Sequence, residues 1–293
     1  MVIYIVPQVS DIFVETYTAE YGTLQVEDKT TCLFVRNETV YRADRSGSVN
    51  REVSRGRLMR SGAHIVSVAD IAFYSDRKGL VSYYYDGLEE TYTPETMENL
   101  RSSVLTSIKD SEGHQVQKAP KETAAAGDVI FKIVDNQKWY LVCWIDRDAA
   151  ERYRDGAAVT VEFPPEKEGG EPVRIEMAVE GLQPQSGETE VILGCNRYYE
   201  EFDRHRILDC SLITSNTSGI LLETESIVEE EGQKGVYVVD KLGDYHFTPV
   251  RILDQDGSVT VVEKNYFYDA EGNSVKTVKN YDEILRPQPE EEE

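Results

Sequence analysis

Side chains that commonly act as nucleophiles, bases or metal ligands are sparse in this chain of 293 residues. A catalytic centre needs a nucleophile with a base, paired carboxylates in a cleft, or metal ligands. The patterns G-x-S-x-G and H-E-x-x-H and the phosphate-binding loop do not occur. The four histidines are scattered along the chain: His64, His114, His205 and His246. We therefore expect a protein that is not an enzyme and has no catalytic, cofactor-binding or metal-binding residues.

The four cysteines include no C-x-x-C pair and have no histidine at metal-ligand spacing, which argues against a zinc site. They are Cys32, Cys143, Cys195 and Cys210. Cys143 lies within the apolar run 139–145, where we expect a buried thiol. Cys195 and Cys210 could pair across two strands in an oxidising compartment, and the sequence leaves this open.

The charge of the chain argues against nucleic acid as a partner. The formal net charge is -23, from 54 Asp plus Glu against 31 Lys plus Arg. Such a chain repels phosphate backbones, and it has no basic run with interleaved aromatic residues. The acidic tail at 287–293 is expected to be a solvated end.

Two similar short segments supply the clearest pattern. Residues 44–47 and 76–79 each read Asp-Arg-x-Gly before a β-prone run, which indicates that the same type of turn occurs twice. Gly47 and Gly79 are expected either at positive φ or where strands approach too closely for a Cβ. Gly56 and Gly62 are expected to turn the chain tightly between the two segments.

The remaining pattern predicts a mainly β protein. Alternating, β-branched runs recur between turn residues, and the chain has 18 Tyr but only 8 Phe, which favours half-exposed sheet faces. One helix is predicted over 94–108. Thr93, Pro94 and Glu95 read as its N-cap, first position and acidic first turn, and apolar residues follow at helical spacing.

Tyrosines supply the candidate contact residues. On a strand, the middle residue of a run of three faces away from the outer two, so at least one ring of such a run must be exposed or lie at an interface. Tyr198 and Tyr199 lie in a charged loop that is either a binding patch or an ordinary solvated loop. The predicted interface set is Tyr83, Tyr84, Tyr85, Tyr198 and Tyr199.

The motif order resembles the HlyD-like membrane fusion proteins, the periplasmic adaptors of efflux pumps and type I secretion systems. Residues 41–68 are similar to the first half of their lipoyl-like, barrel-sandwich hybrid domain, and residues 79–82 to the start of the second half. Residues 127–142 resemble the passage into the adjoining β-barrel domain. Residues 219–252 resemble the closing barrel strand and the membrane-proximal module.

This resemblance implies a division of the chain into five parts. The predicted boundaries are the end of an N-terminal membrane anchor or a first strand at 1–13, a barrel-sandwich domain at 14–135 with a helical insertion at 94–108 packed on the sandwich, a β-barrel at 136–225, a membrane-proximal β module at 226–286, and the acidic tail at 287–293.

Two departures from the family pattern refine its functional implications. Lys78 stands near the tip between the two halves, but outside the Met-Lys-Met or Asp-Lys-Ala setting of lipoyl and biotinyl carriers. Only about ten residues, 69–78, join the halves, where efflux adaptors usually carry a long helical hairpin. The chain therefore resembles the hairpinless adaptors of bacteria with a single membrane.

The resemblance thus implies a membrane-anchored, extracytoplasmic adaptor that binds a membrane protein partner, such as a transporter or envelope complex, and self-associates. Two other functions remain open: a carrier component with a lipoyl-like domain, and a module that binds cell-wall polymers. A lysine adduct in the intact mass would favour the carrier, and an exposed aromatic groove would favour the wall-binding module.

Overall fold

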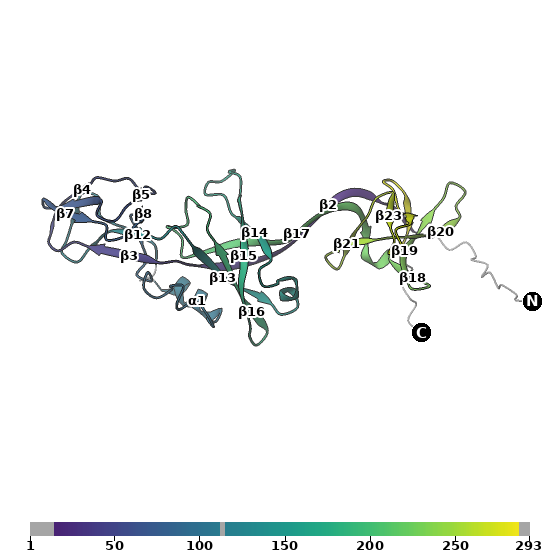
Figure 1. Ribbon diagram of the computed structural model, residues 1–293, viewed down its shortest axis with the longest axis horizontal. Coiled ribbons are helices and arrows are strands. Elements are labelled where there is room, and N and C mark those ends of the chain that lie inside the picture. Colours follow the sequence, from purple (N-terminus) through teal and green to yellow (C-terminus); the bar gives the residue numbers. More distant parts are fainter. Residues whose placement is uncertain (1–14, 112–114, 287–293) are drawn as a thin grey trace, which may run out of the picture. The chain divides into compact units, whose positions relative to one another are not determined.

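The computed structural model describes residues 15–111 and 115–286 (Figure 1). The expected anchor or first strand at 1–13, the tail at 287–293 and His114 lie outside these residues. The described chain is built mainly of strands, as predicted, and forms two compact units. Among the described residues, unit 1 comprises 15–26 and 215–286, and unit 2 comprises those within Glu27–Thr214.

The first part of unit 2 is a sandwich of two four-stranded sheets, which confirms the predicted barrel-sandwich hybrid fold. Its core is a continuous apolar cluster that includes Ile65, Val81 and Phe131. One sheet has the order β11 (Thr123–Ala124), β4 (Gly47–Arg51), β6 (His64–Val68) and β7 (Ile71–Tyr74). The other has the order β3 (Glu38–Arg42), β12 (Val129–Val134), β8 (Gly79–Ser82) and β5 (Leu58–Met59).

Both Asp-Arg-x-Gly segments lie where the chain crosses between these two sheets. The first connects β3 to β4, and the second connects β7 to β8. A Cβ on Gly79 would lie 2.6 Å from the carbonyl oxygen of Val134, and a Cβ on Gly47 would collide with Ala69. Close approach therefore explains these two glycines, whereas Gly56 and Gly62 have φ of 77° and 78° and turn the chain.

The second part of unit 2 is a closed six-stranded barrel. The strand order is β14 (Ala158–Phe163), β15 (Val173–Pro184), β16 (Glu188–Cys195), β13 (Trp139–Asp146), β2 (Glu20–Val35) and β17 (Ile207–Glu223), and β14 pairs with β17 to close it. Aromatic rings fill the interior, with Phe34 stacked on Trp139 at 5.7 Å. A 3₁₀ turn at Ala149–Arg152 follows β13.

The predicted helix is present but shorter than expected. Helix α1 spans Ser103–Asp110, and residues 94–100 form turns instead. The Thr96 hydroxyl donates to the carbonyls of Thr91 and Thr93, and Asn99 has a positive φ of 62°. These local side-chain bonds compete with helical ones, so the helix begins nine residues later than predicted.

The insertion that carries α1 packs on the barrel, which corrects the expectation that it packs on the sandwich. Ile108, Met97 and Leu88 cover outward-facing barrel residues such as Trp144 and Ile192. Figure 1 shows α1 beside β13 and β16. The short strands β9 (Tyr84–Tyr85) and β10 (Gln117–Lys118) pair with each other at the two ends of the insertion.

Unit 1 is a separate β module. Strand β1 (Thr16–Thr18) pairs with β25 (Glu283–Leu285), so the first described strand joins the last. The others are β18 (Val228–Glu230), β19 (Gln233–Val239), β20 (Tyr245–Pro249), β21 (Ile252–Gln255), β22 (Val259–Val262), β23 (Tyr266–Tyr268) and β24 (Ser274–Lys276), with a 3₁₀ turn at Thr224–Ser226.

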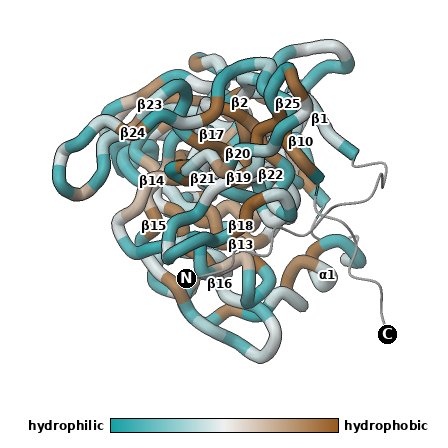
Figure 2. The backbone as a smooth tube through the Cα atoms, turned by 90° about the vertical axis from the view of Figure 1, so that its right-hand side faces the viewer, coloured by the Kyte–Doolittle hydropathy of each residue, from teal (hydrophilic) through white to brown (hydrophobic). Residues whose placement is uncertain are grey.

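The core of unit 1 combines residues from both ends of the chain, including Ala19, Val236 and Ile284. Hydrophobic residues fall mainly on the labelled strands, and the outlying loops are mostly hydrophilic (Figure 2). Residues 15–26 thus belong to this module. The predicted domain boundaries stay predictions, since contacts alone divide the chain only into the two units.

Candidate functional site

A fully buried group of charges lies where the barrel meets the sandwich within unit 2. We name it the junction cluster: Arg36, Glu38, Asp86, Glu89, Lys132 and Arg206. Three cations and three anions balance one another, and every member is at most 5% exposed at its side chain. Arg36 and Glu38 flank the passage from β2 into β3, so the cluster sits on the link between the two domains.

Glu38 is the centre of the junction cluster. Its Oε2 accepts a hydrogen bond from the Arg206 guanidinium at 2.6 Å. Its Oε1 lies 2.6 Å from Lys132 Nζ and 3.0 Å from Arg36 Nε, as ion pairs without hydrogen-bond alignment. Burial opposes ionisation of Glu38, but the charges of Arg36, Lys132 and Arg206 outweigh it and hold its pKa well below its usual range. The carboxyl is therefore ionised at neutral pH and suited to holding its partners together.

The two arginines extend the cluster into the backbone. Arg206 pairs with Asp86 at 2.9 Å and donates to the Phe34 carbonyl at 3.1 Å. Arg36 donates to the carbonyls of Phe202 and His205. A planar guanidinium with several donors can satisfy a carboxylate and a carbonyl together. The arginines thereby join a barrel strand, the loop before β17 and the start of the insertion.

A second, more accessible group connects the sandwich to the same loop. We name it the loop cluster: Arg55, Tyr84, Glu166, Glu201, Asp203 and Arg204. Arg55 donates to Glu201 and Asp203, each at 2.8 Å, and these bonds raise the pKa of its guanidinium against the effect of burial. Arg55 and Arg204 also lie over the Tyr84 ring, at 5.1 and 5.4 Å.

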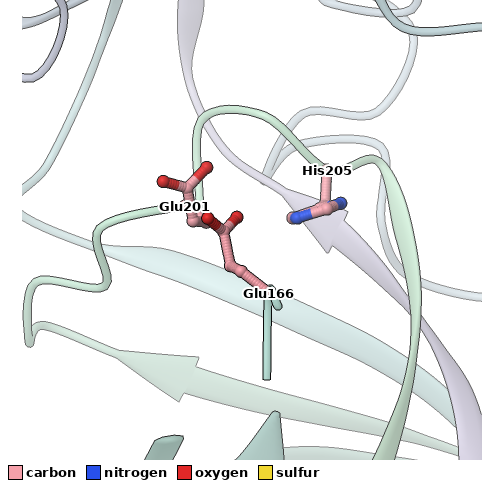
Figure 3. Close-up of side chains that lie close together, drawn as sticks. All are labelled: Glu166, Glu201 and His205. Atoms are coloured by element: carbon pink, nitrogen blue, oxygen red, sulfur yellow. The ribbon is translucent and has the colours of Figure 1, made fainter. Parts of the chain in front are cut away.

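Glu166, Glu201 and His205 place potential metal-ligand atoms within 4.8 Å of one another. Figure 3 shows the two carboxylates side by side with the imidazole next to them. Both oxygens of Glu201 already accept hydrogen bonds from Arg55, and Arg204 donates to one of them. Two guanidinium charges on one carboxylate disfavour a bound cation, so we assign this group to ion pairing.

The five predicted tyrosines divide between interior and surface. Tyr83 is buried, with its hydroxyl donating to the Val53 carbonyl at 2.5 Å and Arg51 over its ring at 3.7 Å. Tyr199 is buried in the barrel and stacks on Phe163 at 4.4 Å. Burial raises the pKa of Tyr199 to about 12. Their rings pack in the interior of the chain, and the interface role of the set stays a prediction.

The surface tyrosines remain candidate contact residues. Tyr198 is 55% exposed and borders an open groove of about 640 Å³ together with Pro165, Glu166 and Glu200. Tyr84 and Tyr85 are half-buried, and the Tyr85 hydroxyl donates to Gln117. The loop that carries Tyr198 and the strand that carries Tyr84 thus meet at the loop cluster. There Arg55 lies over the Tyr84 ring and pairs with Glu201.

Sequence reasoning missed the junction cluster. One signal was present, because Lys132 interrupts the otherwise apolar strand Val129–Val134. A charged residue in the middle of a buried strand needs a buried partner. The partner could not be named from the sequence, since Glu38 lies 94 positions away from Lys132.

The arrangement of a two-sheet sandwich, a closed barrel and a further β module defines a modular adaptor-type protein. Residues 38–135 match the family model described as RND related, barrel-sandwich hybrid domain. Residues 139–216 match the model described as RND related, beta-barrel domain. The chain therefore belongs to the family of membrane fusion proteins, the periplasmic adaptors, and carries its two RND-related domains.

Solved structures show similar but remote relatives. ZneB from Cupriavidus metallidurans is 10% identical, with 96% of this chain and 94% of that chain covered and a TM-score of 0.31. MacA from Actinobacillus actinomycetemcomitans is 9% identical, with coverages of 93% and 99% and a TM-score of 0.39. A putative efflux transporter from Bacteroides eggerthii is 11% identical, with coverages of 86% and 89% and a TM-score of 0.35.

These structural likenesses carry no functional conclusion, because all three TM-scores are below 0.5. No curated protein sequence matches the chain. Within residues 15–111 and 115–286, no helix is long and apolar enough to cross a membrane.

Proposed function

We propose that this protein is a membrane-anchored, extracytoplasmic adaptor of the HlyD type that assembles with a membrane protein partner and with copies of itself. The observation that carries the proposal is the pair of RND-related domains in the family's order, at 38–135 and 139–216. Within the described residues, the charged clusters are occupied by ion pairs and hydrogen bonds, which suits a scaffold.

The short connection between the halves of the sandwich supports a particular kind of adaptor. Strands β6 and β7 form a hairpin whose turn residues, Ala69 and Asp70, both have positive φ. Where related adaptors usually carry a long helical hairpin, this chain turns back within two residues. The proposed adaptor therefore works without the element that docks onto an outer-membrane channel.

The groove bordered by Tyr198, whose lining includes Glu166 and Glu201 of the loop cluster, is the proposed contact surface within unit 2. Tyr198 is an exposed aromatic ring beside a groove with several acidic residues, and aromatic rings at such positions contribute strongly to protein interfaces. A partner that carries basic and apolar residues would complement this groove.

The test is photocrosslinking in the native host from a photoreactive phenylalanine analogue at position 198, with position 268, in unit 1, as the comparison site. The proposal expects crosslinks from position 198 to a membrane protein or to a second copy, and recovery of the chain with carbonate-washed membranes. Recovery in the soluble fraction with no crosslink would contradict it. An intact mass with a lysine adduct would instead favour the carrier function.

A further inference from the structure

Two buried cysteines lie next to each other inside the barrel. The sulfur atoms of Cys32 on β2 and Cys143 on β13 are 2.8 Å apart, and both side chains are completely buried. The two residues are 111 positions apart in the sequence. Both are free thiols in this structure.

The strand register places these residues directly opposite each other. Leu33 pairs with Val142 and Phe34 with Leu141, so the next step of the ladder pairs Cys32 with Cys143. The Phe34 N–H donates to the backbone carbonyl of Arg206 on the other side of β2, so the Phe34–Leu141 pair is not hydrogen-bonded. Because bonded and non-bonded pairs alternate, the Cys32–Cys143 pair is also non-bonded.

Non-bonded pairs bring two antiparallel strands closest together. Their Cα atoms are about 4.5 Å apart, which falls within the range of about 4.4–6.8 Å that a disulfide requires. No strand has to move to form the bond. The other two cysteines are arranged differently: Cys195 contacts the backbone of Arg197, and Cys210 donates to the Leu208 carbonyl.

We propose that Cys32 and Cys143 form a cross-strand disulfide that locks β2 to β13 when the chain folds in an oxidising compartment. This replaces the pairing of Cys195 with Cys210 that the sequence left open. The oxidant is a small or protein disulfide. One cysteine thiolate attacks it to give a mixed disulfide and a thiol, and the second thiolate displaces the remaining thiol, so two cysteine protons and two electrons leave and one S–S bond forms.

Burial determines when the bond forms. Burial and the Cys143 thiol raise the pKa of Cys32 well above its usual value, although the Cys210 thiol acts in the opposite direction, so the thiolate that must attack is scarce in the folded barrel. Oxidation of the folded, reduced protein is therefore expected to be slower than oxidation during refolding, because the thiolate is the attacking species.

The test is refolding of the full chain from denaturant in a glutathione redox buffer, followed by alkylation of free thiols without reduction. We expect a loss of two hydrogens in the intact mass, two alkylated cysteines and a crosslinked peptide pair containing Cys32 and Cys143. The midpoint of urea unfolding should rise and return to the reduced value after reduction. Because this measurement uses purified protein, its outcome is independent of the proposed location.

Matched variants identify the pair. Cys195→Ser should keep the crosslink, and Cys32→Ser and Cys143→Ser should each lose it. Cys210 provides a stringent comparison, because it lies within hydrogen-bonding reach of Cys32, and Cys210→Ser should also keep the crosslink. Four free thiols after oxidative refolding, or a bond that joins Cys210 to Cys32 or to Cys195 in the natural sequence, would overturn the proposal.

Discussion

At the scale of single residues, the main feature is a carboxylate removed from water among three basic groups. Glu38 has no exposed surface at its side chain, and its contacts reach Arg36, Lys132 and Arg206. Buried ion clusters of this kind contribute little net stability compared with apolar residues, but loss of one member leaves the others uncompensated. We therefore expect the cluster to fix how its own residues pair and to add little net stability.

Replacement of the Glu38 carboxylate should therefore destabilise the folded chain. We expect Glu38→Gln to lower the free energy of unfolding by about 3–5 kcal/mol, because three buried cations lose one of their anions. Equilibrium urea unfolding measures the change. The matched control is Glu162→Gln, which removes the exposed Glu162–Arg174 pair and should cost less than about 1 kcal/mol. Equal losses in the two variants would contradict a special role for Glu38.

The same residue predicts a pH dependence. The pKa of Glu38 is lower in the folded than in the unfolded chain, so its contribution is complete above the ordinary glutamate pKa of about 4.3 and is lost as the pH falls below that value. Asp86, whose pKa is also lowered, adds to the loss. Unfolding free energies measured in urea between pH 6 and pH 3 should fall less steeply for Glu38→Gln than for the natural chain. Parallel profiles would count against this assignment.

At the scale of the elements, the glycines at the crossings and at the turns respond to different constraints. Gly79 lacks space, whereas Gly62 has positive φ and no atom within 4 Å of the position that a Cβ would take. Asparagine tolerates positive φ but needs room for its side chain. The same substitution should therefore destabilise the chain by different amounts at the two sites.

We expect Gly79→Asn to destabilise the chain by at least about 1–3 kcal/mol through overpacking against Ile133 and Val134. Gly62→Asn should cost less than about 1 kcal/mol, because asparagine is accepted in the left-handed region. Thermal and urea unfolding of both variants provide the comparison. If Gly62→Asn proved the more damaging change, the distinction between close approach and turn geometry would fail.

The insertion is held to the barrel by another buried carboxylate. Glu190 on β16 accepts the N–H groups of Asn99 and Leu100, both at 2.9 Å, and its side chain is buried. Burial raises its pKa, although the two backbone donors act in the opposite direction. The contact explains why the chain turns at Asn99 instead of continuing the predicted helix.

Glu190→Ala should release the insertion while the barrel stays folded, because two buried donors lose their acceptor at about 1–3 kcal/mol each. Limited proteolysis followed by mass spectrometry should show faster cleavage within residues 86–111. The control is Glu176→Ala, which removes only the exposed Glu176–Arg197 contact. Unchanged cleavage of the Glu190 variant would show that apolar packing alone holds the insertion.

At the scale of the whole molecule, the loop cluster joins the sandwich to the barrel within unit 2. Arg55 belongs to the sandwich, and its partners Glu201 and Asp203 lie in the loop between the last two barrel strands. Arg55 is partly exposed, with 26% of its side chain accessible. A partner protein that binds the groove next to Tyr198 would therefore act directly on the link between the domains.

A double-mutant cycle can measure this link. Arg55→Ala, Glu201→Ala and the double variant should give a coupling energy of about 0.5–3 kcal/mol in urea unfolding, as expected for residues in one ion-pair network. The comparison cycle uses Lys138 and Glu180, a more exposed pair within the barrel, which should couple by less than about 1 kcal/mol. A coupling at Arg55 no larger than that of the comparison pair would remove the case for a structural link.

The amino-acid sequence by itself determined the mainly β composition and the two turns marked by Asp-Arg-x-Gly. Those features depend on local turn chemistry and on the alternation of apolar residues, which neighbouring positions reveal. The order of sandwich and barrel came from the resemblance of the motifs to a known family. The sequence also indicated a buried Cys143 and a helix after residue 93, although not its true start at Ser103.

Only the tertiary structure decided which residues meet. Glu38 and Arg206 are 168 positions apart, and Cys32 and Cys143 are 111 apart, so no local pattern pairs them. Tertiary packing also placed Tyr199 in the barrel core and the insertion on the barrel. In each case strand pairing brings distant segments together, and a charge buried there needs a partner among them.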